Sequence, residues 1–389
     1  MKQFWNIWGS YAIYYFGKVN LSIIIPALII TYPDLNLYDL GLVSTGFMLA
    51  YAIGQFIHGQ VSERFHPYTY ISTGLIISGI INLVLGFVAG FFFALLVLES
   101  FGGFFQAMGW SSTVRANSLI QNDKKKLDES STILGCSYQI GNSITWIVCA
   151  FAVGAFGWQA GFWVSAIILI VEGIILYFTK PYLSYKKESI KKKVKMTLTT
   201  PIILSGMSLL FLNMVRYGVM TWLFAYYVFE GNFPIADFGK VSLKIVFIPI
   251  AGVIGTLIYN RLPFKKDLIS VVFLALMGVT WFLFPYSTGI LATILVLLSS
   301  AFLYGPHVFL VTNLPCRFKE FVASATGFID GMGYIGTTII MLLVPFLVLD
   351  TTGGWNNVFL FWAIISFVAS GILAINYLKY FRKEICVAN

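Results

Sequence analysis

The sequence predicts an all-α polytopic membrane protein, with twelve transmembrane helices in two pseudo-symmetric six-helix bundles. Hydrophobic residues make up 58% of the 389 residues and charged residues only 11%, whereas a soluble domain is about half apolar and about a quarter charged. Apolar runs follow one another along the chain at about 20 residues each, the length with which an α-helix crosses a hydrocarbon core of roughly 30 Å. Similar segments recur in the two halves at a nearly constant spacing.

The apolar runs define the expected spans, and helices are expected because they satisfy their own backbone hydrogen bonds in lipid. The first half contains spans at 8–31, 39–61, 68–88, 91–120, 131–154 and 159–179. The second half contains spans at 201–229, 237–259, 267–286, 289–313, 322–349 and 356–379. The first span is too long, with too little basic charge before it, for a cleaved signal peptide.

Lysine and arginine residues concentrate in alternate loops and at the C-terminal end. By the positive-inside rule, this pattern predicts a multi-pass protein of the cell membrane with both termini cytoplasmic. The net charge of +9 therefore reflects topology, and no nucleic-acid partner is expected. The basic segment 180–200 is interpreted as a cytoplasmic linker between the bundles 1–179 and 201–389. We expect a monomer embedded in the bilayer.

The chemistry-bearing residues give no sign of catalysis. The four cysteines have no CxxC or other metal-ligand spacing, and the three histidines form no cluster with them. No nucleophile and base are paired in the sequence. We therefore predict that the protein is not an enzyme and carries no metal or cofactor.

The two halves resemble each other segment by segment. "YYFGKVN" and "NMVRYGV" place Lys18 and Arg216 198 residues apart, and "GWSSTVRAN" and "GPHVFLVTN" recur at a spacing of 196. "STILGCSYQIG" and "TGFIDGMGYIG" recur at 195, and Gly59 and Gly255 at 196. Duplicated six-helix units are typical of secondary transporters, which bind their substrate near the bilayer midplane between the repeats.

Lys18 and Arg216 lie within apolar spans, at equivalent places in the two repeats. A cation at this depth costs at least about 2.5–3.5 kcal/mol and marks a water-filled pathway or a partner. Two such cations facing a central cavity would suit an anionic substrate. The alternative is that each pairs with a structural carboxylate such as Asp330 or Glu99.

Five segments resemble a known family: "YYFGKVNLSIIIP", "YAIGQFIHGQVSERFHP", "MGWSSTVR", "RYGVMTW" and "ATGFIDGMGYIG". They are similar to the organophosphate:phosphate antiporters of the major facilitator superfamily, which include glycerol-3-phosphate and hexose-phosphate transporters. The resemblance covers both halves in order. It implies that Lys18 and Arg216 occupy the positions of two phosphate-binding arginines. The tyrosines implied to line the cavity are Tyr11, Tyr15, Tyr51, Tyr304 and Tyr334. Simple membrane-interface positions are the alternative for Tyr11 and Tyr15, and for their neighbour Tyr14.

The sequence also departs from that family. Lys18 offers a point charge where the family has the two-pronged guanidinium. Gln55 replaces a lysine of the glycerol-3-phosphate carriers, Tyr138 replaces a histidine, Gln139 an asparagine, and Pro249 an acid. These departures retain the expectation of an anion but leave open phosphate, carboxylate or sulfonate. Gln55, Tyr138 and Gln139 are included among the candidate binding residues.

Four further residues are candidates for coupling or gating. Asp330 lies four residues before Tyr334 on one helix face and is interpreted as either a proton carrier or the partner of a cation, with the second favoured. Glu63 and Arg64 resemble the cytoplasmic gate of the superfamily, although an ordinary charged turn is the alternative. Arg115 either attracts anions or, as we favour, pairs with Asp128 or Glu129.

Two lysines of the span 237–259 are further candidates for contact with anions. Lys240 and Lys244 share a helix face and are interpreted either as an outer funnel for anions or as partners of Asp237.

The sequence as a whole predicts a secondary active transporter of a small organic anion. Exchange of an organophosphate for inorganic phosphate by alternating access is the first interpretation. The alternatives are proton-coupled symport of an organic anion such as a carboxylate, with Asp330 or Glu99 carrying the proton, and a transporter-like sensor of the same ligand.

Overall fold

The computed structural model describes residues 2–62, 65–120, 124–181, 199–314, 322–349 and 352–381. Across these ranges the chain forms helices and no strand. Twelve helical segments in these ranges are long and apolar enough to cross a membrane. The predicted all-α architecture with twelve spans is therefore confirmed. Glu63, Arg64 and residues 182–198 of the expected linker lie outside the described residues.

The first six spans are built from eight α-helices and one short 3-10 turn, because two spans are interrupted. These elements are α1 (Lys2–Tyr14), η1 (Tyr15–Gly17), α2 (Asn20–Thr31), α3 (Leu37–Val61), α4 (Pro67–Val88), α5 (Phe92–Gln106), α6 (Met108–Ile120), α7 (Lys124–Phe156) and α8 (Trp158–Phe178).

The last six spans contain further interruptions and two short π-helices. Their elements are α9 (Thr200–Glu230), η3 (Ile235–Asp237), α10 (Phe238–Ile245), α11 (Phe247–Arg261), α12 (Lys266–Leu283), η4 (Phe284–Tyr286), α13 (Gly289–Val308), η5 (Phe309–Asn313), α14 (Val322–Leu349), α15 (Trp355–Asn376) and η7 (Tyr377–Phe381).

The chain divides into two compact units. Unit 1 comprises Met1–Ser189 and Met220–Val246, and unit 2 comprises Ile190–Val219 and Phe247–Asn389. The end of α9 and all of α10 therefore belong to unit 1 by their contacts. The division of the sequence into bundles 1–179 and 201–389 stays a prediction.

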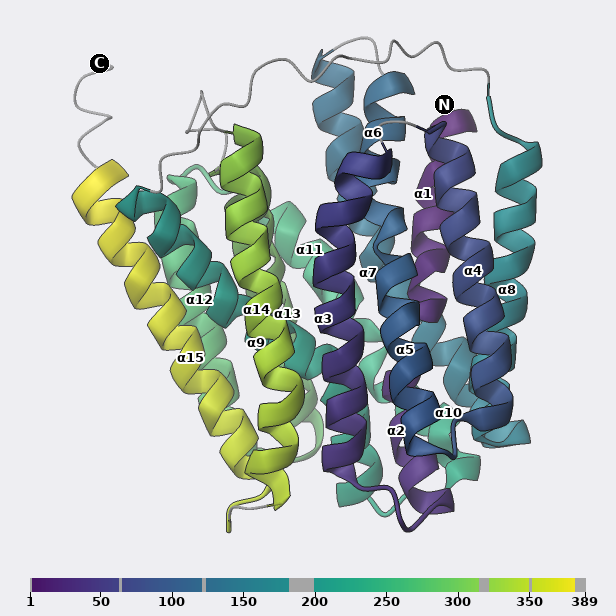
Figure 1. The fold of residues 1–389 in the computed structure, drawn as a ribbon. Coiled ribbons are helices and arrows are strands. Elements are labelled where there is room, and N and C mark those ends of the chain that lie inside the picture. The colour runs from purple at the N-terminus through teal and green to yellow at the C-terminus, as the bar shows by residue number, and fades with distance from the viewer. Residues whose placement is uncertain are drawn as a thin grey trace. The chain divides into compact units, whose positions relative to one another are not determined.

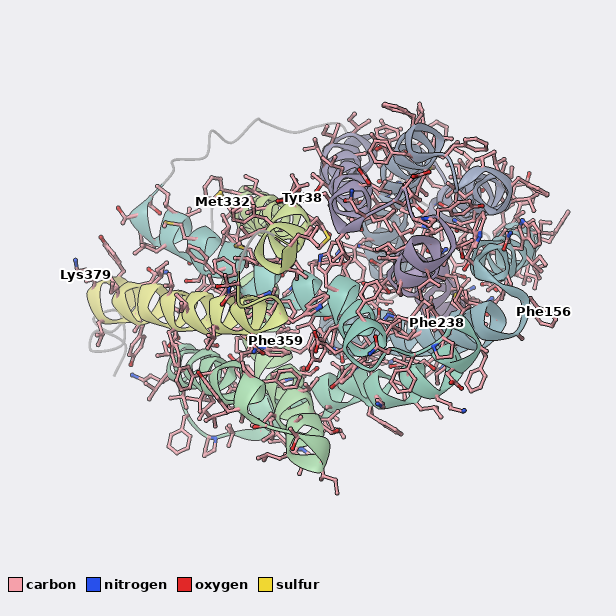
Figure 2. The ribbon with its side chains drawn as sticks, turned by 90° about the horizontal axis from the view of Figure 1, so that it is seen from below. Tyr38, Phe156, Phe238, Met332, Phe359 and Lys379 are labelled. Carbon is pink, nitrogen blue, oxygen red and sulfur yellow. The ribbon has the colours of Figure 1, made fainter. Side chains whose placement is uncertain are left out.

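Within unit 1, α4 packs against α8 and α3 against α5, and α1, α4 and α8 run side by side (Figure 1). Gly103 of α5 allows a close approach to α3, since a Cβ there would collide with the Phe47 carbonyl. Helix α10, which comes from the second half of the sequence, packs on α7. At this contact the Ser143 hydroxyl donates to the Val246 carbonyl at 3.0 Å. Phe238 of α10, labelled in Figure 2, is fully buried, and its ring centroid lies 5.2 Å from that of Phe224 in the same unit.

Unit 2 repeats these pairings with the equivalent spans. Here α12 packs against α15, next to each other in Figure 1, and α11 packs against α13. Gly255 of α11 lies so close to α13 that a Cβ would collide with the Ala301 carbonyl. Thus the third and sixth, and the second and fourth, spans pair in each half of the sequence. The equivalent contacts agree with the duplication that the sequence predicts.

One interruption has a direct cause in the sequence. The eighth span breaks at Val246, between α10 and α11. Pro249 has no N–H to bond the Ile245 carbonyl, and its ring crowds that carbonyl, so the hydrogen-bond ladder of the helix fails at this turn.

Candidate functional site

Lys18 lies at an interruption of the first membrane span in unit 1. The α-helix ends at Tyr14, a 3-10 turn follows, and α2 begins at Asn20. The amides of Lys18 and Val19 both donate to the Tyr15 carbonyl, at 3.1 and 3.0 Å. The break turns the chain locally while keeping Lys18 within the span, where its side chain is only 9% exposed.

The ammonium group of Lys18 lies over an aromatic ring from the second span. Its Nζ is 3.8 Å from the ring centroid of Tyr51 and 5.7 Å from that of Tyr15. The negative face of an aromatic ring stabilises a cation at this distance, more strongly when water is excluded. The Tyr51 hydroxyl in turn accepts a hydrogen bond from Gln55 Nε2 at 2.8 Å. Two predicted residues of α3 are thus placed at Lys18.

The remaining predicted residues of unit 1 extend this cluster. The rings of Tyr15 and Tyr138 stack with centroids 6.1 Å apart, and Gln139 Nε2 lies 3.5 Å from the Tyr138 hydroxyl. Tyr11 contacts the Tyr15 ring at 6.2 Å and the Trp110 ring at 4.9 Å. Tyr11 and Tyr15 are buried, so they do not face the lipid as interface residues would.

Arg216 is the corresponding cation of unit 2. It lies in α9 and is only 6% exposed. The guanidinium carbon is 4.9 Å from the ring centroid of Tyr217 and 5.5 Å from that of Tyr304. Tyr217 also contacts Tyr334 of α14, with ring centroids 6.4 Å apart. Arg216 and the two predicted tyrosines of unit 2 therefore form a second aromatic cluster around a buried cation.

Three residues of these clusters escaped the sequence reasoning: Trp110, Tyr217 and His307. His307 Nε2 lies 3.2 Å from Arg216 Nη1, and its side chain is 9% exposed. From the sequence alone, the histidines are weighed only as possible metal ligands. The available signal was helical spacing, because His307 follows the predicted residue Tyr304 by three positions and so shares its helix face.

Three of the remaining candidate charges are Asp330 of unit 2 and two lysines of unit 1. Asp330 is on α14, partly exposed, one turn before Tyr334. Lys240 pairs with Asp237 at 2.6 Å, as one interpretation predicted. Lys244 instead lies near the rings of Phe233 and Tyr227. Among the described residues, no group of three or more His, Cys, Asp or Glu side chains is close enough together to hold a metal.

Arg115 holds the chain that follows the second span. Its Nη1 donates to the carbonyls of Ser62 and Phe65, the latter at 3.0 Å. These carbonyls flank Glu63 and Arg64, which lie outside the described residues. The predicted pairing of Arg115 with Asp128 or Glu129 also involves side chains outside them. Arg115 thus clamps the backbone at the expected gate.

Removing this clamp is expected to impair the conformational cycle more than substrate binding. We predict that Arg115→Ala lowers the transport rate several-fold, because hydrogen bonds from a charged group are each worth about 1.5–3 kcal/mol before solvent screening. Arg115→Lys should retain part of the rate. Transport rates and affinities in proteoliposomes check this, and a loss of affinity at an unchanged maximal rate would contradict it.

Comparison with known families decides the classification of this chain. The family model of the Major Facilitator Superfamily matches residues 7–318. The chain belongs to the Major Facilitator Superfamily. The predicted resemblance is thereby confirmed at the level of the superfamily.

Individual relatives are more distant. The chain is 24% identical to the membrane sensor protein UhpC of Escherichia coli, over 97% of this chain and 91% of that protein. It is 25% identical to the glycerol-3-phosphate transporter of Bacillus subtilis, over 97% of this chain and 91% of that protein. It is 23% identical to a probable hexose phosphate transport protein of Chlamydia muridarum, over 86% of this chain and 82% of that protein. These relatives agree with the organophosphate:phosphate antiporter resemblance.

Solved structures of other transporters share the fold. An inward-facing bacterial homologue of the human lysosomal transporter Spinster superposes with a TM-score of 0.76, at 14% identity, over 96% of this chain and 98% of that one. The xylose transporter XylE of E. coli superposes with a TM-score of 0.73, also at 14% identity, over 95% and 94%. Together with the superfamily match and the twelve candidate spans, this shared fold makes the chain a multi-pass membrane protein of a transporter superfamily rather than an enzyme.

Proposed function

We propose that this protein is a secondary carrier that exchanges an organophosphate for inorganic phosphate by alternating access. One observation carries the proposal: each unit contains a cation that is buried within a membrane span and surrounded by tyrosines. Intramembrane cations face substrate pathways by default, because they are costly in lipid. A buried cation at the equivalent position of each repeat is what a transporter with a duplicated sequence requires for an anionic substrate.

The residue types suit a phosphate group. A guanidinium binds two phosphate oxygens with parallel N–H donors, whereas an ammonium acts as a point charge. Tyrosine hydroxyls add neutral donors, and their rings stabilise the cations when no anion is bound. Relatives named as glycerol-3-phosphate and hexose phosphate transporters support the same substrate class for this chain.

Purified protein in liposomes loaded with inorganic phosphate tests the proposal. External glycerol 3-phosphate or glucose 6-phosphate should drive release of labelled phosphate, and an empty liposome interior should prevent uptake. Uptake that needs no internal anion and follows an imposed pH gradient would contradict exchange and favour proton symport.

A second function is favoured by one relative. The E. coli protein that matches over 97% of this chain is named as a membrane sensor. A sensor of this fold would use the same cations to bind the ligand without carrying it. Saturable binding of a phosphorylated compound, together with no exchange in the same liposomes, would favour this alternative.

Orientation and assembly are part of the proposal. We place both termini and the basic linker 180–200 on the cytoplasmic side, and we expect a monomer. A reporter fused to the C-terminus, active only in the cytoplasm, and the mass of the protein in detergent micelles test these two statements.

Asp330 separates exchange from proton symport. We predict that Asp330→Asn still exchanges phosphate, with altered affinity, and that exchange is insensitive to an imposed pH gradient. The reason is that unit 2 already holds Arg216, and a carboxylate that offsets a cation need not move a proton. Exchange rates are measured with and without a pH gradient, in both proteins. A variant that lost uphill, pH-driven uptake but kept downhill exchange would contradict the prediction.

A further inference from the structure

His307 is in direct hydrogen-bond contact with Arg216, and the proposed function leaves it without a task. It lies near the end of α13, three residues after Tyr304. Its Nε2 is 3.2 Å from Arg216 Nη1. A guanidinium has only donors, so Nε2 must accept this bond through its lone pair. A neutral imidazole carries one proton, and that proton must then be on Nδ1.

The Nδ1–H group is a buried donor. Nδ1 has no hydrogen-bond acceptor among the described residues, and the side chain is 91% buried. Buried donors in folded proteins almost always have an acceptor. In a transporter, a donor that no protein group satisfies and that adjoins the substrate cation is a candidate for contact with the substrate.

The geometry of the imidazole ring limits which part of the substrate this donor can reach. The N–H at Nδ1 and the lone pair at Nε2 point away from each other across the ring. Any acceptor for Nδ1–H has to approach from the side of the ring opposite to the Arg216 guanidinium. A phosphate oxygen held by Arg216 at Nη1 does not reach that side. An acceptor supplied by the substrate would therefore belong to a portion beyond its phosphate.

We infer that His307 is a further substrate-binding residue, whose Nδ1–H donates to a hydroxyl, carbonyl or carboxylate oxygen in the organic part of a phosphorylated substrate. The inference rests on the proposed function and deepens it. Arg216 would bind the phosphate that both exchanged anions share. His307 would favour the organophosphate over inorganic phosphate, because inorganic phosphate has no organic part whose oxygen could accept from Nδ1–H.

Two substitutions separate the two nitrogens of the ring. In His307→Gln, the longer amide reaches the Nε2 position and its oxygen accepts from Arg216, while the Nδ1 donor is lost. In His307→Asn, the shorter amide places an N–H at the Nδ1 position, while the acceptor for Arg216 is lost. The probes are inorganic phosphate, methyl phosphate and glycerol 3-phosphate. Binding is measured on the full-length protein in detergent, with thermal unfolding as the check on folding.

We expect His307→Gln to bind inorganic phosphate and methyl phosphate nearly as the wild type does, and glycerol 3-phosphate about tenfold less tightly, as the loss of one hydrogen bond implies. His307→Asn should weaken all three probes by a similar factor and keep their ratio. Wild-type protein should bind methyl phosphate no more tightly than inorganic phosphate, and glycerol 3-phosphate more tightly. This last comparison uses only the wild-type protein, so it can be made even where a substitution prevents folding.

The inference is overturned if His307→Gln weakens all probes equally, since His307 would then only orient Arg216. It is also overturned if wild-type protein binds inorganic phosphate at least as tightly as glycerol 3-phosphate. A wild-type protein that binds none of the three probes would overturn the proposed function itself, and the inference with it.

Discussion

Arg216→Ala is expected to abolish phosphate exchange and to weaken phosphate binding by on the order of 100-fold or more. Truncating one partner of a buried, hydrogen-bonded charge pair costs about 2–5 kcal/mol, and each 1.4 kcal/mol is about tenfold in affinity. The side chain is buried between the rings of Tyr217 and Tyr304, so water replaces it poorly. Equilibrium binding of labelled phosphate in detergent measures the effect.

Two control variants sharpen this experiment. Arg216→Lys keeps the charge but loses the two-pronged donor. Its phosphate affinity should therefore lie between that of the wild type and that of Arg216→Ala. Lys240→Ala removes a cation whose side chain is 78% exposed and which pairs with Asp237, and it should bind phosphate normally. An Arg216→Ala protein that bound phosphate normally but unfolded at a much lower temperature would make Arg216 a structural residue.

The spans could be predicted from the sequence because the bilayer imposes a simple rule on composition and length. A run such as 68–88 had to be a helix of about that length, and α4 covers Pro67–Val88. Interruptions inside the spans follow weaker rules. Pro249 explains the break at Val246, but nothing in the local sequence required the first span to break at Lys18.

The candidate residues were found by family resemblance and repeat position, and their contacts needed the structure. Lys18 and Tyr51 are on different spans, so the placement of the ammonium over the ring depends on how α3 packs, which a sequence pattern does not specify. His307 was missed because a histidine signals metal binding only in a cluster. Its contact with Arg216 depends on the approach of α9 to α13.

The assignment of 220–246 to unit 1 could not be foreseen either. The sequence repeat suggests six helices in each half, because duplication acts on the chain. Contacts between helices follow surface shape, and Gly239 of α10 leaves room for the Phe151 ring of α7. A segment of the second half thereby packs as part of unit 1.

Lys18→Met is expected to weaken phosphate binding by about 30-fold or more, because it removes a buried cation, at a cost of about 2 kcal/mol or more, while keeping a side chain of similar length that still packs against the Tyr51 ring. Lys18→Arg is expected to retain binding or to improve it, since a guanidinium also lies well over an aromatic ring and adds the bidentate contact to phosphate. Phosphate affinity and exchange rate are measured for both variants beside the wild type.

The ring beneath Lys18 provides the matched control. Tyr51→Phe keeps the ring and loses only the hydroxyl that Gln55 contacts, so its phosphate affinity should fall by less than tenfold, as for one neutral hydrogen bond of about 1 kcal/mol. Tyr51→Leu removes the ring that stabilises the ammonium in the empty state, so it should perturb exchange more than Tyr51→Phe. If Lys18→Arg lost all activity while Lys18→Met kept it, the Lys18 cluster would be shaped for an anion smaller than phosphate, and the organophosphate proposal would have to be abandoned for this chain.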